Sequence, residues 1–308
     1  MTKYRKDFRK IAEKLTLSDL QSGLSEEKIT LDSLIEGGRI KQESGLFLDL
    51  FSACGIDNVL RVFGIKDALA AKGLKGICVR IDTSDPYLHK LFIYFDKKKD
   101  CDHCICELVM KKSYFQVKQR FPGHFPSRPL NFLHIEWLLL QNPTRSFTDD
   151  KPPLPGQNYP GLGLGDMLVE LLILLGRRLR FEGISNKPAY FHTAFMFTRD
   201  CFFLNPEYQG LIFSARRKLL RNFSFYTVAW ASYFECIYLK DSKEKFVWQP
   251  DWIILPLSKE LIKYFRSWEY RFTVKRAERK FDFEIDRKRL KELMHKKGLP
   301  IREDLTVD

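Results

Sequence analysis

The feature that most constrains the fold of this chain is a glycine-rich segment that runs directly into an apolar stretch of helical length. Residues 155–166 read PGQNYPGLGLGD and hold four of the seventeen glycines, and MLVELLILL follows at once. Glycine is costly to order, but it lets backbone N–H groups approach an anion closely. The start of a helix adds partial positive charge at the same place. The pattern predicts a phosphate cradle made of Gly161, Leu162, Gly163, Leu164 and Gly165.

Two familiar nucleotide motifs do not fit this segment. The third glycine comes too early for the G-x-G-x-x-G fingerprint of dinucleotide-binding proteins. No Gly-Lys-Ser/Thr follows, so the segment is not the P-loop of nucleotide triphosphatases. The predicted cradle therefore belongs to another class of phosphate site.

Strand and helix patterns alternate through the middle of the chain. Apolar runs separated by turn residues predict strands in four segments, 76–85, 89–96, 104–117 and 132–143, and a helix over 166–181. Further along, the pattern predicts helices after Pro188, over 211–222 and after Ser258, and a last charged helix ending near 297. Strands are expected at the start of 201–210, over 225–239 and 246–257, and at 280–286.

This alternation predicts an α/β fold of mixed α+β character, with helices flanking a central mixed β-sheet. Residues 1–75 read mainly as helices, including 30–38 and 45–64, and form an expected N-terminal region. Residues 76–240 form the expected α/β domain, and 241–308 a basic α+β extension.

Composition indicates a globular protein of the cytoplasm. Hydrophobic residues make up 44% of the 308 residues, which is enough for a sizeable core. The chain has no apolar run long enough to span a bilayer, and its basic N-terminus lacks the apolar segment of a secretory signal. Seven cysteines, an odd number, favour reduced thiols over a disulfide framework.

The net charge of +13 indicates an anionic ligand or partner. The basic residues are spread along the chain, so the charge fits a polyphosphate ligand or an acyl carrier protein as well as a nucleic acid. The basic run SARRKLLR, 214–221, is read as one solvated helix face. A nucleic-acid partner stays open on this evidence but is not favoured.

In its middle part, the chain resembles the GNAT-type N-acyltransferases, which use acyl-coenzyme A. Their pyrophosphate loop runs Gln/Arg-x-x-Gly-x-Gly/Ala into a leucine-rich helix, and an alanine-containing helix and an aromatic pair come later. The matching elements here are Gly163, Gly165, MLVELL, GRRLRFEGI, Ala194 and 201–203. The resemblance covers roughly 76–240 and implies acetyl-CoA or another acyl-CoA as co-substrate, with its pyrophosphate on the amides of 161–165.

The sequence departs from the family pattern at two places. Pro160 stands where the family carries Gln or Arg, and Gln157 fits that position only with an insertion. The tyrosine that protonates the leaving thiolate in the family falls near Thr198, with Phe197 beside it. The chain therefore resembles the family's cofactor loop more closely than its catalytic acid.

Glu136 is the best candidate for the base that an amine acceptor requires. It lies on the predicted strand before the glycine-rich loop, where the family often carries a glutamate, and burial would raise its pKa toward neutrality. His134 is two residues earlier and is expected on the same strand face. The alternatives are that Glu136 pairs with an arginine on the other face, or that the two side chains only satisfy one another.

Two other patterns in the sequence have simpler explanations than a functional site. The stretch CDHCIC brings together Cys101, His103, Cys104 and Cys106, but no second pair of ligands follows, so a hairpin with buried cysteines is favoured over a metal site. Residues 120–141 resemble the G-H-F-P signature of hot-dog thioester dehydratases, with His124 and Glu136 as the acid–base pair. That resemblance ends after Pro129, and chance similarity is favoured.

The leading hypothesis is an acyl-CoA-dependent N-acyltransferase-like protein that acts on a small-molecule or protein amine by direct attack. The alternatives are a non-catalytic protein that binds coenzyme A, a nucleotide or a partner on the same fold, and a basic nucleic-acid-associated protein. No metal ion is implied by any of these hypotheses.

Overall fold

The structure is a computed structural model that describes residues 3–23, 45–116 and 125–305. Helices surround a seven-stranded mixed sheet with strand order β1-β2-β3-β4-β5-β8-β6, and β7 and β9 form a second, two-stranded sheet. The mixed α/β fold class predicted from the sequence is confirmed. Contacts along the chain divide it into two units, 1–112 with 135–145 and 161–175, and 113–134 with 146–160 and 176–308. The three-part division at 75 and 240 stays a prediction.

The first unit begins with helices, as the sequence predicts. They are α1 (Arg5–Lys14), α2 (Leu17–Gln21), α4 (Ala53–Val62) and α5 (Ile65–Ala70). Thr16 and Asp19 form a capping box at the start of α2, and Ser52 caps α4 by accepting a hydrogen bond from the N–H of Gly55. Of the expected N-terminal helices, 30–38 falls outside the described residues, and 45–64 is helical only from Ala53.

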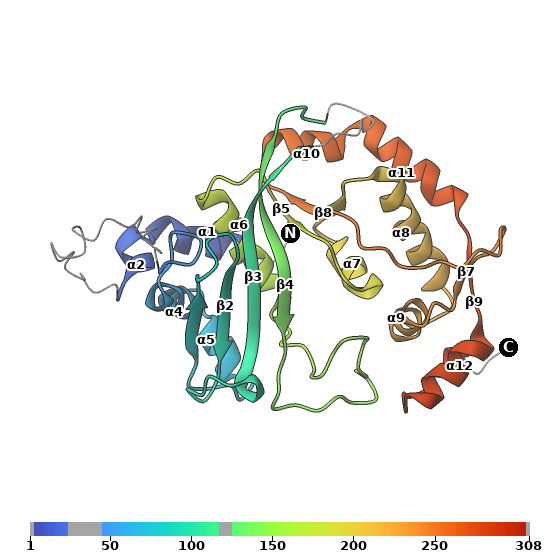
Figure 1. The fold of residues 1–308 in the computed structure, drawn as a ribbon, viewed down its shortest axis with the longest axis horizontal. Helices are drawn as coiled ribbons and strands as arrows, with labels where there is room; N and C mark the ends of the chain where they lie inside the picture. Colours follow the sequence, from blue (N-terminus) through green and yellow to red (C-terminus); the bar gives the residue numbers. More distant parts are fainter. Residues whose placement is uncertain (1–2, 24–44, 117–124, 306–308) are drawn as a thin grey trace. The chain divides into compact units, whose positions relative to one another are not determined.

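An antiparallel meander follows these helices. Strands β1 (Cys78–Asp82), β2 (His89–Tyr94) and β3 (Cys104–Phe115) run in succession, with α4 against β1 (Figure 1). The next strand, β4 (Leu130–Leu140), leads through a long loop to α6 (Gly165–Arg178). Four predicted strands and the predicted helix after the glycine-rich loop are thus present, because their turn signals and apolar runs are local in sequence.

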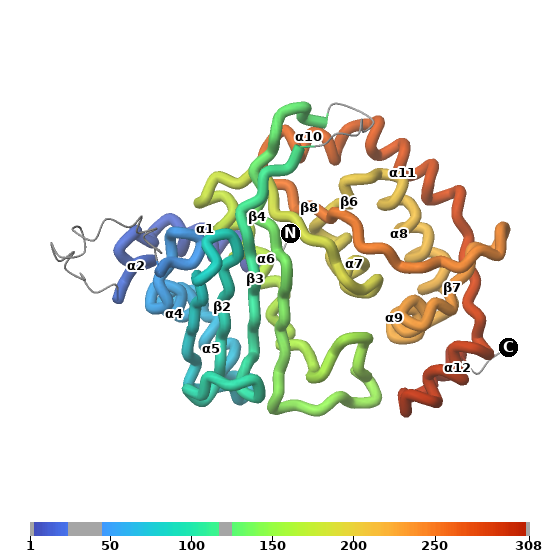
Figure 2. The backbone as a smooth tube through the Cα atoms, in the orientation of Figure 1, coloured from blue at the N-terminus to red at the C-terminus, as the bar shows by residue number. Residues whose placement is uncertain are grey.

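The second unit carries the other elements, which are short strands and longer helices (Figure 2). The elements are β5 (Gly183–Asn186), α7 (Phe191–Phe197), β6 (Phe202–Phe203), α8 (Pro206–Leu219), α9 (Phe225–Tyr233), β7 (Ile237–Leu239), β8 (Ile253–Pro256), α10 (Lys259–Arg266), α11 (Trp268–Lys280), β9 (Phe283–Ile285) and α12 (Arg287–Lys296). Its cores are rich in aromatic side chains, which pack edge to face in many pairs.

One long predicted strand, 225–239, is wrong. Most of it is helix α9, whose N-terminus is capped by Ser224, and only Ile237–Leu239 is a strand. Seven consecutive residues of α9 are buried, from Tyr226 to Ser232. A helix that is buried on all sides has no polar face, so its sequence looks like that of a buried strand.

Two shorter predictions in this unit also need correction. The helix expected over 211–222 begins earlier, at Pro206 of α8, because Asn205 caps it and proline is tolerated in the first turn of a helix. Of the strand expected over 246–257, only β8, Ile253–Pro256, is present, because Pro250 has no N–H to donate to a neighbouring strand.

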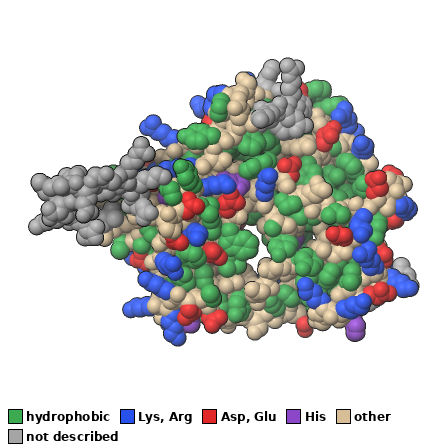
Figure 3. All heavy atoms as spheres, in the orientation of Figure 1, with side chains coloured by type: hydrophobic (Ala, Val, Ile, Leu, Met, Phe, Trp, Pro, Cys, Tyr) green, Lys and Arg blue, Asp and Glu red, His purple; other side chains and the backbone are tan. Residues whose placement is uncertain are grey.

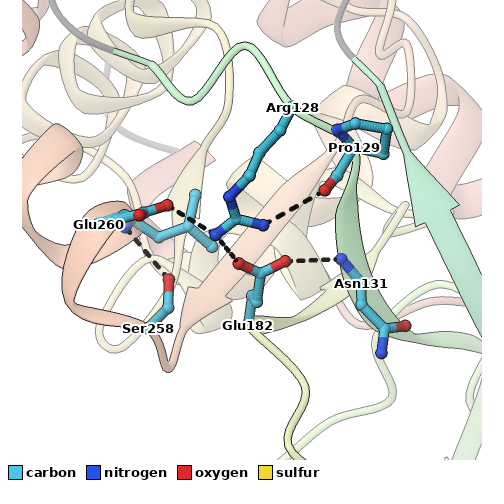
Figure 4. Close-up of polar contacts among 7 residues, drawn as sticks. Arg128, Pro129, Asn131, Glu182, Ser258 and Glu260 are labelled. Atoms are coloured by element: carbon cyan, nitrogen blue, oxygen red, sulfur yellow. Dashed lines mark hydrogen bonds and ion pairs between the residues drawn. The ribbon is translucent and has the colours of Figure 1, made fainter.

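The start of β4 is tied to β5 and α10 by one arginine (Figure 4). Arg128 pairs with Glu182, which precedes β5, and with Glu260 in the first turn of α10. Glu182 also accepts a 2.8 Å hydrogen bond from the N–H of Asn131, and its backbone O accepts from the N–H groups of 257 and 258. Three segments far apart in sequence are therefore joined through Glu182.

Candidate functional site

The glycine-rich loop lies at the carboxyl end of β4. Gln141, just after this strand, donates from its backbone N–H to the O of Ile105 and from its side chain to the O of Cys104, at 3.0 Å in both cases. A Cβ on Gly161 would lie 3.8 Å from the O of Leu140. The chain thus leaves β4 at 141 and returns to the same strand end before α6 begins. In α/β folds, this edge of a sheet is a frequent place for ligands.

Gly163 has a backbone conformation that favours glycine. Its φ is +67°, a region that L-residues rarely adopt, and its side of the loop is exposed. At Gly165, the first residue of α6, no described atom lies within 4 Å of the position that a Cβ would take. Leu162 and Met167, in contrast, are buried and fix both ends of the turn. Gly165 therefore faces open space, while Leu162 and Met167 on either side of it anchor the loop.

A lysine that no sequence motif indicates lies beside the loop. The ammonium of Lys72, from the segment after α5, is 3.7 Å from the Cβ position at Gly163. Within the described part of the chain, Lys72 has neither an ion pair nor a hydrogen bond through its side chain. The loop thus combines a helix start, a glycine with positive φ and a cation without a counter-ion. This combination suits a phosphate group.

Glu136 forms an ion pair with Lys111 of the neighbouring strand β3. About a third of each side chain is exposed, so the pair lies at the surface of its unit. Trp137, the next residue, donates a 3.1 Å hydrogen bond to the carboxylate of Glu107 on β3. Glu136 thus has a lysine partner on the neighbouring strand.

His134 is buried and has different partners from Glu136. Its Nδ1 lies 3.0 Å from the Oγ of Ser185 on β5, and its ring packs edge-on against Trp252 at 4.9 Å between centroids. Lys187 lies over the other ring of that pair, 4.6 Å from the centroid of Trp252. These contacts describe a histidine held in a packed, aromatic setting.

Gln157 closes a turn of its own loop. Its side-chain O accepts a 3.0 Å hydrogen bond from the N–H of Leu154, and its own N–H donates to the O of Leu154. The preceding Gly156, with φ of +79°, allows this turn to pack on Tyr190, whose ring would meet a Cβ at 2.6 Å. The side chain predicted to contact pyrophosphate is therefore engaged in shaping the loop.

The position of the family's acidic tyrosine carries a threonine that is hydrogen-bonded to the backbone. The Oγ1 of Thr198 donates a 2.7 Å hydrogen bond to the O of Phe195 at the end of α7. A histidine at the start of the same helix, His192, is buried and stacks on Tyr190 at 5.4 Å. Burial lowers the pKa of His192 to about 4, so its imidazole is neutral at neutral pH.

Two of the three cysteines in the CDHCIC stretch are buried thiols on a strand, whereas Cys101 is exposed in the turn before it. Cys104 and Cys106 lie in β3, where burial raises the pKa of Cys104 to about 11 and that of Cys106 to about 12. His103 pairs instead with Asp100. No group of three His, Cys, Asp or Glu residues with metal-binding geometry occurs among the described residues. His124, from the hot-dog resemblance, lies outside the described residues.

Basic side chains are spread over the surface and mixed with acidic ones on the face drawn in Figure 3. None of the helices in the described ranges is long and apolar enough to cross a membrane. Known proteins give no further guide to the site, because neither the models of protein families nor the curated proteins include a match to this chain.

Proposed function

We propose that this chain binds an acyl-CoA through the loop 161–165 and transfers the acyl group to an amine. The observation that carries this proposal is the ammonium of Lys72 beside Gly163, at the start of α6 and the end of β4. The order of core strand, glycine-rich loop and apolar helix is the order that the GNAT resemblance requires. The resemblance and the local charge therefore favour the same ligand.

The loop offers a pyrophosphate three kinds of stabilisation. The exposed N–H groups of Gly163 and Gly165 donate hydrogen bonds, α6 adds the partial positive charge of its N-terminus, and Lys72 adds a full charge. Asp166 in the first turn of α6 opposes these groups, because its carboxylate lies next to Gly165 in the chain. Replacing Asp166 with Asn is therefore expected to tighten the binding of a phosphate ligand.

In the proposed reaction, the nitrogen of a neutral amine attacks the thioester carbon, and the C–S bond breaks to give an amide and coenzyme A. A base removes the amine proton, and the leaving thiolate takes up a proton. Glu136 is the candidate base. It lies four residues before Leu140 on β4, about 13 Å along the strand. In coenzyme A, the pantetheine arm separates the thioester from the pyrophosphate. A base at this distance from the loop therefore suits a thioester whose pyrophosphate is bound at 161–165.

A non-catalytic protein that binds coenzyme A is the second candidate. Thr198 and Phe197 provide no phenol where the family has its acidic tyrosine, and Thr198 donates its hydroxyl proton to a backbone carbonyl. A chain with the cradle and without the acid could hold an acyl-CoA for a partner. The two candidates share the ligand and differ in turnover.

Thermal unfolding with coenzyme A, ATP and NADH tests the shared ligand. A ligand at about a hundred times its dissociation constant adds roughly 2.7 kcal/mol to the free energy of unfolding. We expect this shift with coenzyme A and acetyl-CoA, and its loss in Gly163→Val. The matched control is Gly64→Val, since Gly64 has φ of +69° and no described atom within 4 Å of a Cβ.

The outcomes test three points one at a time: whether coenzyme A binds, whether it binds at the loop 161–165, and whether the chain catalyses transfer. The absence of any shift in the unmodified chain would refute coenzyme A binding, and an equal shift in Gly163→Val would refute the cradle. Thiol release from acetyl-CoA in the presence of a panel of amines then distinguishes the transferase from the non-catalytic candidate.

A further inference from the structure

Helix α11 presents two opposite stripes of side chains. Tyr270, Val274 and Ala277 are buried and pack toward α8, where Gly210 allows the two backbones to approach closely (Figure 1). The opposite stripe, with spacing i, i+4, i+7 and i+11, consists of exposed residues. They are Trp268, Phe272, Lys275 and Arg279. The outer stripe of α11 thus begins with two aromatic rings and continues with two cations.

The two rings form a parallel stack at the surface. Trp268 is 71% exposed and Phe272 is 50% exposed. Their centroids are 4.9 Å apart with an interplanar angle of 17°. Exposed apolar rings of this size are unusual on a soluble surface without a partner. A stacked pair still leaves outer ring faces free, and such faces suit another flat ring.

The surroundings of the stack carry unbalanced positive charge. Seven exposed basic residues of α10 and α11 form no ion pair with any residue in the described ranges, namely Lys259, Lys263, Arg266, Arg271, Lys275, Arg279 and Lys280. The acidic residues nearby are already paired: Glu260 with Arg128, Glu278 with Arg217 and Asp282 with Lys218. Among the acidic residues of α10 and α11, only Glu269 forms no ion pair with a residue in the described ranges. The face therefore attracts a polyanion.

We propose that the outer face of α11 binds single-stranded nucleic acid. A single strand carries both flat bases and phosphates, and so complements a ring stack followed by cations at helical spacing. In a duplex, the bases are stacked inside and present no ring face to Trp268. An anionic membrane is a poorer fit, because the outer stripe changes from rings to Lys275 and Arg279 after one turn and has no continuous apolar face to immerse. This inference is independent of the coenzyme A proposal.

Fluorescence anisotropy of labelled 20-mer DNA and RNA single strands, with the full chain, tests the inference. Trp268→Ala is expected to weaken binding about tenfold, since stacking one base on an aromatic ring is worth about 1–3 kcal/mol. Tyr87→Ala is the control, because Tyr87 is 75% exposed and lies outside this helix. Both variants should unfold at the same temperature as the unmodified chain.

The salt dependence tests the role of the cations. A variant with R271A, K275A and R279A should lower the slope of log affinity against log salt by about two, since each phosphate contact on a single strand contributes roughly 0.7. The charge-matched control replaces the exposed Lys6, Lys10 and Lys14 of α1 with alanine and should leave the slope unchanged.

Each contrary outcome overturns the inference. Equal affinity for single strand and duplex, or equal weakening by Trp268→Ala and Tyr87→Ala, would show that the ring stack has no part in binding. Equal slopes for the two triple variants would show that the charge acts without a site on α11. Sedimentation with vesicles of phosphatidylserine and phosphatidylcholine, without binding of single strands, would assign the face to membranes instead.

Discussion

Lys72 lies beside Gly163, with its ammonium 3.7 Å from the position that a Cβ would occupy at the glycine. The lysine follows α5 and the glycine precedes α6, so all four strands from β1 to β4 lie between them in the chain. A cation and a glycine of positive φ before one helix start are features that favour the binding of an anion. The following prediction depends directly on this relationship.

Lys72→Met is expected to weaken coenzyme A binding about tenfold, because one charge-assisted contact with a phosphate is lost. The free energy of unfolding should change by less than about 0.5 kcal/mol, since the ammonium has no partner among the described residues. Isothermal titration calorimetry measures the affinity. Lys75→Met, at an exposed lysine three residues later, is the matched control and should bind like the unmodified chain. Equal loss in both variants would contradict a specific role for Lys72.

Glu136→Gln separates catalysis from stability. The ion pair with Lys111 is partly exposed, so its loss should cost no more than about 1 kcal/mol of unfolding free energy. Removing a general base lowers turnover by about a hundredfold or more, while affinity for coenzyme A stays unchanged. The rate of thiol release against pH is the measurement. Glu107→Gln, which affects the carboxylate bound by Trp137 on the same pair of strands, is the control and should keep its turnover.

Glu182→Gln is predicted to destabilise the chain by about 1–3 kcal/mol, because a charged acceptor of several hydrogen bonds is lost at a half-buried position. Burial raises the pKa of Glu182, but the hydrogen bonds from Arg128 and from the N–H of Asn131 outweigh it and lower the pKa overall. The contribution of Glu182 to the free energy of unfolding is therefore fully present above the carboxyl's usual pKa of 4.5. It is lost as the pH falls through the lowered pKa of Glu182 in the folded chain.

Urea unfolding at pH 7 and at successively lower pH measures this contribution. Glu260→Gln removes the other carboxylate that binds Arg128, but Glu260 is more than half exposed, so the loss should be smaller. A larger loss for Glu260→Gln than for Glu182→Gln would contradict the importance assigned to Glu182.

Local patterns in the sequence are enough to predict the first half of the sheet and the loop that follows it. The strands from β1 to β4 are separated by turn residues, and the glycines of 161–165 indicate an irregular backbone conformation before α6. Such signals extend over a few residues, which is the range in which propensity and periodicity act.

Helix α9 of the second unit and the cation at the loop could not be predicted in this way. Helix α9 is buried on all sides, so its sequence has neither the polar face of a helix nor the alternation of a strand. Lys72 and the contacts of Arg128 with Glu182 and Glu260 depend on tertiary folding, because their partners lie 54 residues or more away in the chain. No spacing rule connects residues at such separations.

His192 is predicted to make stability depend on pH in the weakly acidic range. Its ring is buried, and burial lowers its pKa from the usual 6.5 to about 4. The unfolded chain therefore binds a proton that the folded chain does not, and stability falls as the pH drops from 6.5 toward 4. The full effect is on the order of 3 kcal/mol.

His192→Phe should flatten this part of the curve of unfolding free energy against pH, since the new ring retains the packing on Tyr190 and has no titrating nitrogen. His295→Phe, at an exposed position of α12, is the control and should leave the curve unchanged. A curve in His192→Phe as steep as that of the unmodified chain would assign the pH dependence to other groups.

Gly210→Ala is expected to be the most damaging single methyl addition in the second unit. A Cβ at Gly210 would clash with the backbone O of Val274 and lie 2.6 Å from the Cβ of Ala277, so α8 and α11 would have to separate. Such overpacking typically costs about 1–3 kcal/mol, and more when backbone atoms must move. Gly176→Ala is the control, because its closest neighbour is the side-chain end of Leu257, which can rotate away. Thermal unfolding should show a drop of several degrees for Gly210→Ala and a smaller one for Gly176→Ala. Nucleic-acid binding in Gly210→Ala should weaken together with stability, since the outer face of α11 depends on the packing of its inner face.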